Sequence, residues 1–244
     1  MIRHIPNTIT LLNILCGCIA AVFAVQNEME LTALFVFLGI FCDYFDGLSA
    51  RLLNVQSDLG IQLDSLADMI TCGLVPGLVM FQLMDMSLTG GWNHGSGPEG
   101  FGWASLFPCL AFLITLSSAY RLARFNIDEN QVSSFLGLPT PANALLILSL
   151  PLILLYHGND TLNSIILNPW FLTGQTLLSS LLLNAPIRLF ALKFKNWGFK
   201  DNALRYIFVI LSLVLLLTVQ FMAIPVIIAL YLLSSLLGKE QQAE

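Results

Sequence analysis

The chain has 244 residues, of which 57% are hydrophobic and 10% charged, and its formal net charge is −5. Soluble domains carry about 25% charged residues, so this composition excludes an ordinary soluble globule. The negative net charge gives no overall basic field that would attract nucleic acid, and we expect no nucleic-acid partner. The composition instead predicts an all-α integral membrane protein.

Eight apolar stretches are each near the ~20 residues that a helix needs to cross a bilayer. In chain order they cover residues 8–26, 31–50, 61–84, 103–124, 140–157, 166–186, 204–219 and 223–238. The first could be read as a signal peptide after Arg3, but its polar residues, such as Asn13, favour a helix of the mature protein. The sixth is the weakest, because Pro169 and Asn184 interrupt it. Pro76 is expected to kink the third.

The positive charges fall on one side of these eight stretches. With a cytoplasmic N-terminus, the inside segments are 1–7, 51–60, 125–139, 187–203 and 239–244. Together with the helix ends that border them, they contain all 10 Lys and Arg residues. The outside loops contain only acidic and uncharged residues. The positive-inside rule therefore predicts eight spans with both termini in the cytoplasm.

Four aspartates lie where the second and third stretches reach the cytoplasmic side. Asp43 and Asp46 are three residues apart, and Asp64 and Asp68 are four apart, so each pair shares one face of its helix. The two helices are antiparallel and joined by a short segment. Both pairs are therefore expected at the same membrane depth, near the cytoplasmic boundary.

Such a group of carboxylates needs a compensating charge. An Asp at mid-span costs about 2.5–3.5 kcal/mol on insertion scales, and two ionised carboxylates 4 Å apart repel by about 4 kcal/mol at an effective dielectric of 20. Arg51 can neutralise one charge at most. Oxygen-only ligands suit Mg²⁺ or Mn²⁺, and two bridged cations would match the charge. A cation-coupled transporter is the alternative, although its polar residues should lie near the bilayer centre.

Small residues surround the carboxylates. Gly47, Ala50 and Gly60 remove side-chain bulk where the second helix ends and the third begins. This would let a phosphate-bearing ligand approach the backbone closely.

The full spacing resembles the signature of the CDP-alcohol phosphotransferase family: Asp43-x2-Asp46-Gly47-x2-Ala50-Arg51-x8-Gly60-x3-Asp64-x3-Asp68. The resemblance implies transfer from a CDP-linked alcohol to a second alcohol with release of CMP. It also implies a two-metal site on Asp43, Asp46, Asp64 and Asp68, with Asp68 as the general base. "PNTIT" (6–10) resembles the family's entry to the first helix, which borders the nucleotide. The residues expected to bind the nucleotide or CDP-lipid are Asn7, Thr10, Asp46, Gly47, Ala50, Arg51 and Gly60.

Three further motifs resemble the bacterial and archaeal phosphatidylserine synthase branch of this family. They are "IPNTITLLNILCG" (5–17), "RLARFN" (121–126) and "FLGLPTPANA" (135–144), and "LKFKNW" (192–197) is a less specific fourth. The branch implies CDP-diacylglycerol as donor and L-serine as acceptor, in the inner membrane with the active site facing the cytoplasm. The family also implies a homodimer. We expect one membrane domain over 1–244, with the catalytic part at 1–144 and C-terminal helices at 145–244.

Arg121 and Arg124 form a basic pair at the cytoplasmic end of the fourth stretch. A guanidinium can bind a carboxylate with two hydrogen bonds, so either arginine could bind the acceptor amino acid. A phosphate would suit them equally, which leaves glycerol 3-phosphate and inositol phosphate open as acceptors. Both could also simply anchor the helix at the interface.

Overall fold

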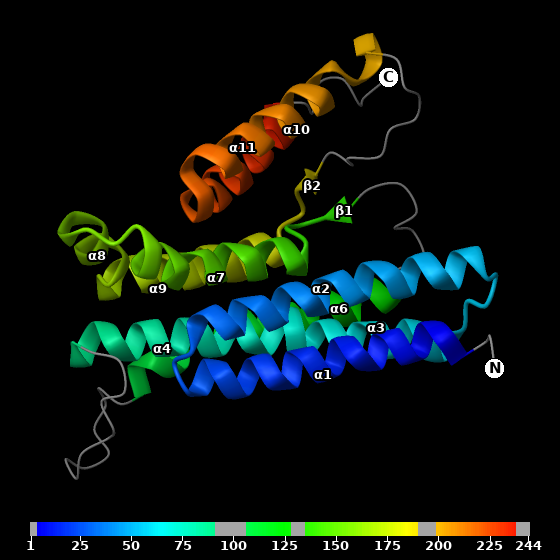
Figure 1. Ribbon diagram of the computed structural model, residues 1–244, viewed down its shortest axis with the longest axis horizontal. Helices are drawn as coiled ribbons and strands as arrows, with labels where there is room; N and C mark the ends of the chain where they lie inside the picture. The colour runs from blue at the N-terminus through cyan, green and yellow to red at the C-terminus, as the bar shows by residue number, and fades with distance from the viewer. Residues whose placement is uncertain (1–3, 91–105, 128–134, 190–198, 238–244) are drawn as a thin grey trace.

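The computed structural model describes residues 4–90, 106–127, 135–189 and 199–237. Within them the regular secondary structure is helical apart from one short strand pair, and short turns join the elements (Figure 1). The first half contains α1 (Ile5–Val25), α2 (Met29–Leu52), α3 (Asp58–Asp68), the π-helix η2 (Met69–Leu74), α4 (Val75–Thr89), the 3₁₀-helix η3 (Phe107–Ala111) and α6 (Phe112–Ile127). The second half contains α7 (Thr140–Tyr156), α8 (Asp160–Ile166), α9 (Pro169–Asn184), α10 (Phe199–Val219), the 3₁₀-helix η4 (Gln220–Met222) and α11 (Ala223–Leu237). Strands β1 (Phe135–Leu136) and β2 (Arg188–Leu189) pair antiparallel, with Phe135 opposite Leu189.

The described helices are those of a membrane protein. Four stretches are long and apolar enough to cross a bilayer: Ile5–Val25, Met29–Leu52, Asp58–Thr89 and Tyr206–Ser235. The pair α8–α9 makes a fifth if it counts as one bent span. The helices occupy the same parts of the sequence as the eight predicted stretches, but the number that crosses the membrane stays a prediction. Of the charges that predicted the orientation, Arg3, Lys193, Lys195 and Lys239 lie outside the described residues, as does "LKFKNW".

The last apolar stretch is a helical hairpin. The backbone at Gln220 has a positive φ of 47°, and the chain reverses there. The ring centroids of Phe208 in α10 and Tyr231 in α11 are therefore only 5.8 Å apart. Figure 1 shows the two helices side by side. The hairpin packs on α7 mainly through α11, so most of α10 faces outward.

The interruption predicted at Pro169 is a bend between two helices. The axes of α8 and α9 differ by 55°. Asn168 caps the new helix by accepting a hydrogen bond from the Trp170 backbone N–H at 2.9 Å, and Pro169 occupies its first turn, where no donor is needed. Asn184 ends α9, and its side-chain amide donates to the Ser117 carbonyl of α6 at 3.0 Å.

The third stretch contains a π-helix directly before Pro76, the residue at which a kink was expected. Pro76 lies in the first turn of α4, directly after η2. Proline lacks an N–H and its ring clashes with the carbonyl four residues earlier in a regular α-helix. The wider π turn relieves this conflict, and π turns often occur at functional sites.

Thr71 of this π-helix fills a narrow space between α1 and α2. Its hydroxyl donates to Asn13 Oδ1 at 2.8 Å. A Cβ added at Gly17 would lie 2.5 Å from Thr71 Oγ1, and one added at Gly39 would lie 2.7 Å from Thr71 Cγ2. These two glycines therefore let three helices pack closely just beyond the four aspartates.

Candidate active site

Three of the four predicted aspartates form a compact acidic cluster. Asp43 and Asp46 come from the last turns of α2 and Asp64 from α3, and one carboxylate oxygen of each lies within 4.8 Å of the others. Asp43 and Asp64 are within hydrogen-bonding reach of each other. Asp46 is buried, and its Oδ2 has no hydrogen-bond partner. A buried, unpaired carboxylate oxygen beside two further carboxylates fits a hard divalent cation.

Asp68 lies one helical turn beyond Asp64 and has additional neighbours on α6 and α7. Its Oδ2 accepts a hydrogen bond from the Thr140 hydroxyl of α7 at 3.4 Å, whereas its buried Oδ1 has no partner. Arg121 of α6 interacts with it electrostatically. Asp68 is not one of the three residues in the compact cluster. Its Oδ1 is therefore available to an incoming group, as Asp46 Oδ2 is within the cluster.

The residues predicted to bind the nucleotide gather around this cluster. Thr10 is buried in α1 within hydrogen-bonding reach of Asp46, and its hydroxyl proton can alternatively go to the Pro6 carbonyl at 3.1 Å. A Cβ at Gly60 would lie 3.3 Å from Asn7 Oδ1, so the starts of α1 and α3 approach each other closely there.

The other residues predicted to bind the nucleotide, Gly47, Ala50 and Arg51, lie at the end of α2. Arg51 is exposed and its Nε donates to the Gly47 carbonyl at 2.9 Å, while Ala50 is half-buried. Ser57 caps α3 by accepting from the Gly60 N–H at 3.2 Å. The start of α3, and with it the place of Asp64, is fixed by this cap.

The two arginines of α6 have different environments. Arg121 is half-buried beside Asp68, and its Nε has no hydrogen-bond partner. Arg124 is exposed and lines a separate shallow cavity with Tyr120, Ala123 and Ile127. The geometry therefore brings Arg121 alone of this pair toward Asp68.

Asn126 of the same motif joins α6 to α3. Its Oδ1 accepts from the Ser65 hydroxyl at 3.1 Å, and its Nδ2 donates to Gln62 Oε1 at 3.3 Å. This connection holds the helix that carries Arg121 against the helix that carries Asp64 and Asp68.

The "GLPTPANA" segment turns the chain so that α7 begins at the site. Gly137 has a φ of +73°, and a Cβ there would collide with the Leu183 carbonyl. The Leu138 N–H donates to the Leu182 carbonyl at 2.9 Å, which anchors the turn on α9. Pro139 precedes the helix, which starts with Thr140. The turn thus places the Thr140 hydroxyl next to Asp68.

Sequence reasoning singled out neither Thr140 nor Asn143. Asn143 is fully buried one turn after Thr140, and both polar atoms of its side chain have no partner. The available signals were their place in the motif "FLGLPTPANA" (135–144) and their polarity in the first turns of an apolar helix.

The comparisons with known proteins agree on one family. The model of the family described as "CDP-alcohol phosphatidyltransferase" matches residues 3–181. A Bacillus subtilis protein named CDP-diacylglycerol–serine O-phosphatidyltransferase is 32% identical over 143 residues, which are 57% of this chain and 70% of that protein. A Helicobacter pylori protein of the same name is 30% identical over 235 residues, 93% of this chain and 87% of its own length. A Methanocaldococcus jannaschii protein of that name is 32% identical over 143 residues, 59% of this chain and 58% of its own. The chain belongs to the CDP-alcohol phosphatidyltransferase family.

Proposed function

We propose that the chain transfers the phosphatidyl group of CDP-diacylglycerol to L-serine, giving phosphatidylserine and CMP. The observation that carries this proposal is the acidic cluster of Asp43, Asp46 and Asp64 beside a partly unpaired Asp68 and Arg121. Family membership supports the reaction type, and the names of the relatives from three organisms support serine as acceptor.

The donor end of the site would hold two Mg²⁺ or Mn²⁺ ions on Asp43, Asp46, Asp64 and Asp68. Such cations supply positive charge that neutralises the donor pyrophosphate and the charge developing on the leaving CMP. The nucleotide would border the cluster at Thr10 and Asn7. Thr10 lies next to Asp46, and Asn7 lies next to Gly60. Gly47, Ala50 and Arg51 continue this surface along the end of α2.

The acceptor end would be formed by α6 and α7. The free Oδ1 of Asp68 can take the proton of the serine hydroxyl, while Thr140 holds the other oxygen. The serine oxygen then forms a bond to phosphorus as the bond between phosphorus and the CMP oxygen breaks. Arg121 has an unpaired Nε and can bind the serine carboxylate. Arg124, which is exposed, would have a weaker role.

The topology is part of the proposal. We infer eight spans in one membrane domain, with the catalytic part at 1–144, and both termini in the cytoplasm. The site would face the cytoplasm from the inner membrane, where serine and CMP are soluble. The chain would act as a homodimer. The cation-coupled transporter is disfavoured because all four aspartates lie in those halves of Met29–Leu52 and Asp58–Thr89 that adjoin the connection between the two helices.

The test is CMP release by the purified protein from CDP-diacylglycerol with Mg²⁺ or Mn²⁺. We expect release with L-serine and none above background with glycerol 3-phosphate or inositol phosphate. Release with one of the phosphorylated acceptors instead would keep the acidic cluster as the donor site and reject serine. A folded protein that releases no CMP with any acceptor would reject the proposed function.

A further inference from the structure

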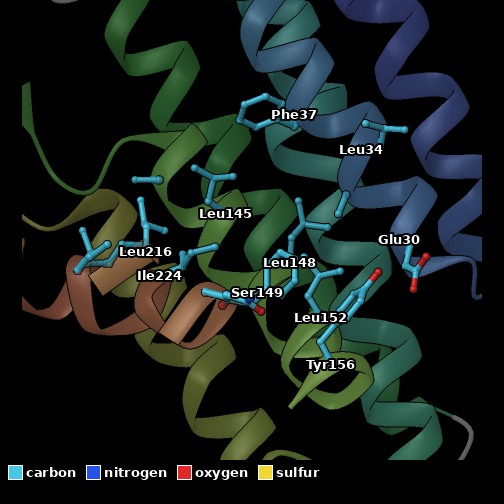
Figure 2. Close-up of a pocket in the computed structure, with 16 residues that line it drawn as sticks. Glu30, Leu34, Phe37, Leu145, Leu148, Ser149, Leu152, Tyr156, Leu216 and Ile224 are labelled. Atoms are coloured by element: carbon cyan, nitrogen blue, oxygen red, sulfur yellow. The ribbon is translucent and has the colours of Figure 1, made fainter. Parts of the chain in front are cut away.

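A large apolar cavity runs beside the site, between α2, α7 and the C-terminal hairpin (Figure 2). Its volume is about 730 Å³. One wall is the part of α2 from Glu30 to Phe37 and another is the part of α7 from Ala142 to Tyr156. Leu216, η4 and α11 close the third side.

Two of the four polar side chains that line this cavity, those of Glu30 and Tyr156, gather at one end. Figure 2 shows Glu30 and Tyr156 together there, away from Phe37 and Leu145. The Tyr156 hydroxyl is within hydrogen-bonding reach of the Glu30 carboxylate. Ser149, midway along α7, donates to the Leu146 carbonyl at 2.6 Å, so its donor is already used. Apart from Gln220 of η4, the other residues that line the cavity are apolar.

The other end of the cavity adjoins the site. Ala142 is two residues after Thr140, whose hydroxyl contacts Asp68. From Ala142 to Tyr156, α7 rises about 21 Å at 1.5 Å per residue. A lipid acyl chain fills one leaflet of about 15 Å in a bilayer. The cavity thus has the length and the lining for one extended acyl chain that starts at the site.

We propose that this cavity holds one acyl chain of the diacylglycerol lipid during the reaction, and that Glu30 and Tyr156 limit its length. This inference rests on the proposed function, because it takes the lipid donor from it. Bilayer and cavity are both apolar, so the cavity adds selectivity for chain length more than affinity. A chain that extended past the end would remove water from the Glu30 carboxylate, which is unfavourable.

The experiment compares two donors, CDP-dihexanoylglycerol and CDP-dipalmitoylglycerol, by CMP release with L-serine in detergent micelles. Ala33 lines the cavity one turn from Glu30, so Ala33→Phe fills the far end. Ala229 of α11 is exposed and not part of the lining, so Ala229→Phe is the matched control. A second variant, Glu30→Ala, removes the polar end.

We expect Ala33→Phe to raise the KM for the dipalmitoyl donor about tenfold. The KM for the dihexanoyl donor and for serine should stay within about twofold, which also shows that the variant is folded. Glu30→Ala is also measured with a longer donor, CDP-diarachidoylglycerol, and should lower its KM relative to that of the dipalmitoyl donor. Ala229→Phe should behave as the unchanged protein does with both donors.

The inference is overturned by two results together. The first is that Ala33→Phe changes the KM of both donors equally or changes neither. The second is that Glu30→Ala leaves the chain-length preference unchanged. An Ala229→Phe variant with the same chain-length effect as Ala33→Phe would also overturn it. Failure of the proposed function looks different, because the unchanged protein would then release no CMP with serine from either donor.

Discussion

Replacing Gly39 by alanine tests the close packing that holds the site together. The added Cβ would lie 2.7 Å from Thr71 Cγ2 and 2.8 Å from Asn13 Oδ1. Thr71 and Asn13 are both fully buried and bonded to each other, so neither can move freely. Asp43 is one helical turn further along α2. Any outward shift of α2 therefore also moves Asp43 away from Asp64.

The expected loss can be worked out from these contacts. Overpacking of this kind costs about 1–3 kcal/mol, and weakening the Asn13–Thr71 hydrogen bond costs about 1 kcal/mol more. The higher helix propensity of alanine stabilises the folded state by about 1 kcal/mol relative to glycine. A net loss of about 2 kcal/mol would lower the melting midpoint by roughly 4–8 °C for a chain of this size.

The assay is thermal unfolding in detergent, followed by fluorescence, together with CMP release at several Mg²⁺ concentrations. Gly174→Ala is the matched control, because a Cβ at Gly174 of α9 meets nothing within 4 Å. Adding Thr71→Ser to Gly39→Ala removes the Cγ2 methyl group and should recover part of the loss. If Gly39→Ala melts at the same temperature as Gly174→Ala, the close packing of α2 on η2 is wrong.

Three further substitutions test the roles of the site residues. Asp68→Asn should reduce CMP release to background while the protein stays folded and binds CDP-diacylglycerol, and near-normal turnover would remove Asp68 from the base role. Arg121→Lys should raise the KM for serine about tenfold or more, because a charge-assisted hydrogen bond is lost, whereas Arg124→Lys should change this KM little. Serine titration of both variants measures the two KM values. Equal effects of the two substitutions would reject the different roles of the two arginines. Asp43→Asn should raise the Mg²⁺ or Mn²⁺ concentration needed for half-maximal CMP release, and the exposed Asp58→Asn should not; the same metal dependence in both variants would argue against Asp43 as a ligand.

The helices and the acidic cluster could be predicted because both depend on local patterns. Apolar length predicts where the helices lie, and spacings of three and four residues put each Asp pair on one face. A short connection between antiparallel helices then brings Asp43 and Asp46 to Asp64. No long-range information is needed for this part of the site.

The partners from other helices could not be predicted in this way. Thr140 reaches Asp68, and Asn13 reaches Thr71, through packing between helices distant in sequence. Periodicity within one helix does not say which helix lies next to it. The different environments of Arg121 and Arg124 could not be predicted for the same reason. A spacing of three residues leaves them about 60° apart around the helix, so the edge of the interface with α3 can bury the first and expose the second.

The π-helix between α3 and α4 makes the number of residues in this segment as important as their identity. A π turn contains one residue more than the α-helix would place there, and one residue corresponds to a rotation of about 100°. Loss of a single codon within residues 69–74 would remove the extra residue of the π turn, and Pro76 would then conflict with the carbonyl four residues earlier. Asp64 and Asp68 would then turn by that angle relative to Gly77 and the rest of α4, although every one of these residues was still present. Deletions and insertions in this segment should therefore be tolerated less well than substitutions among its apolar side chains.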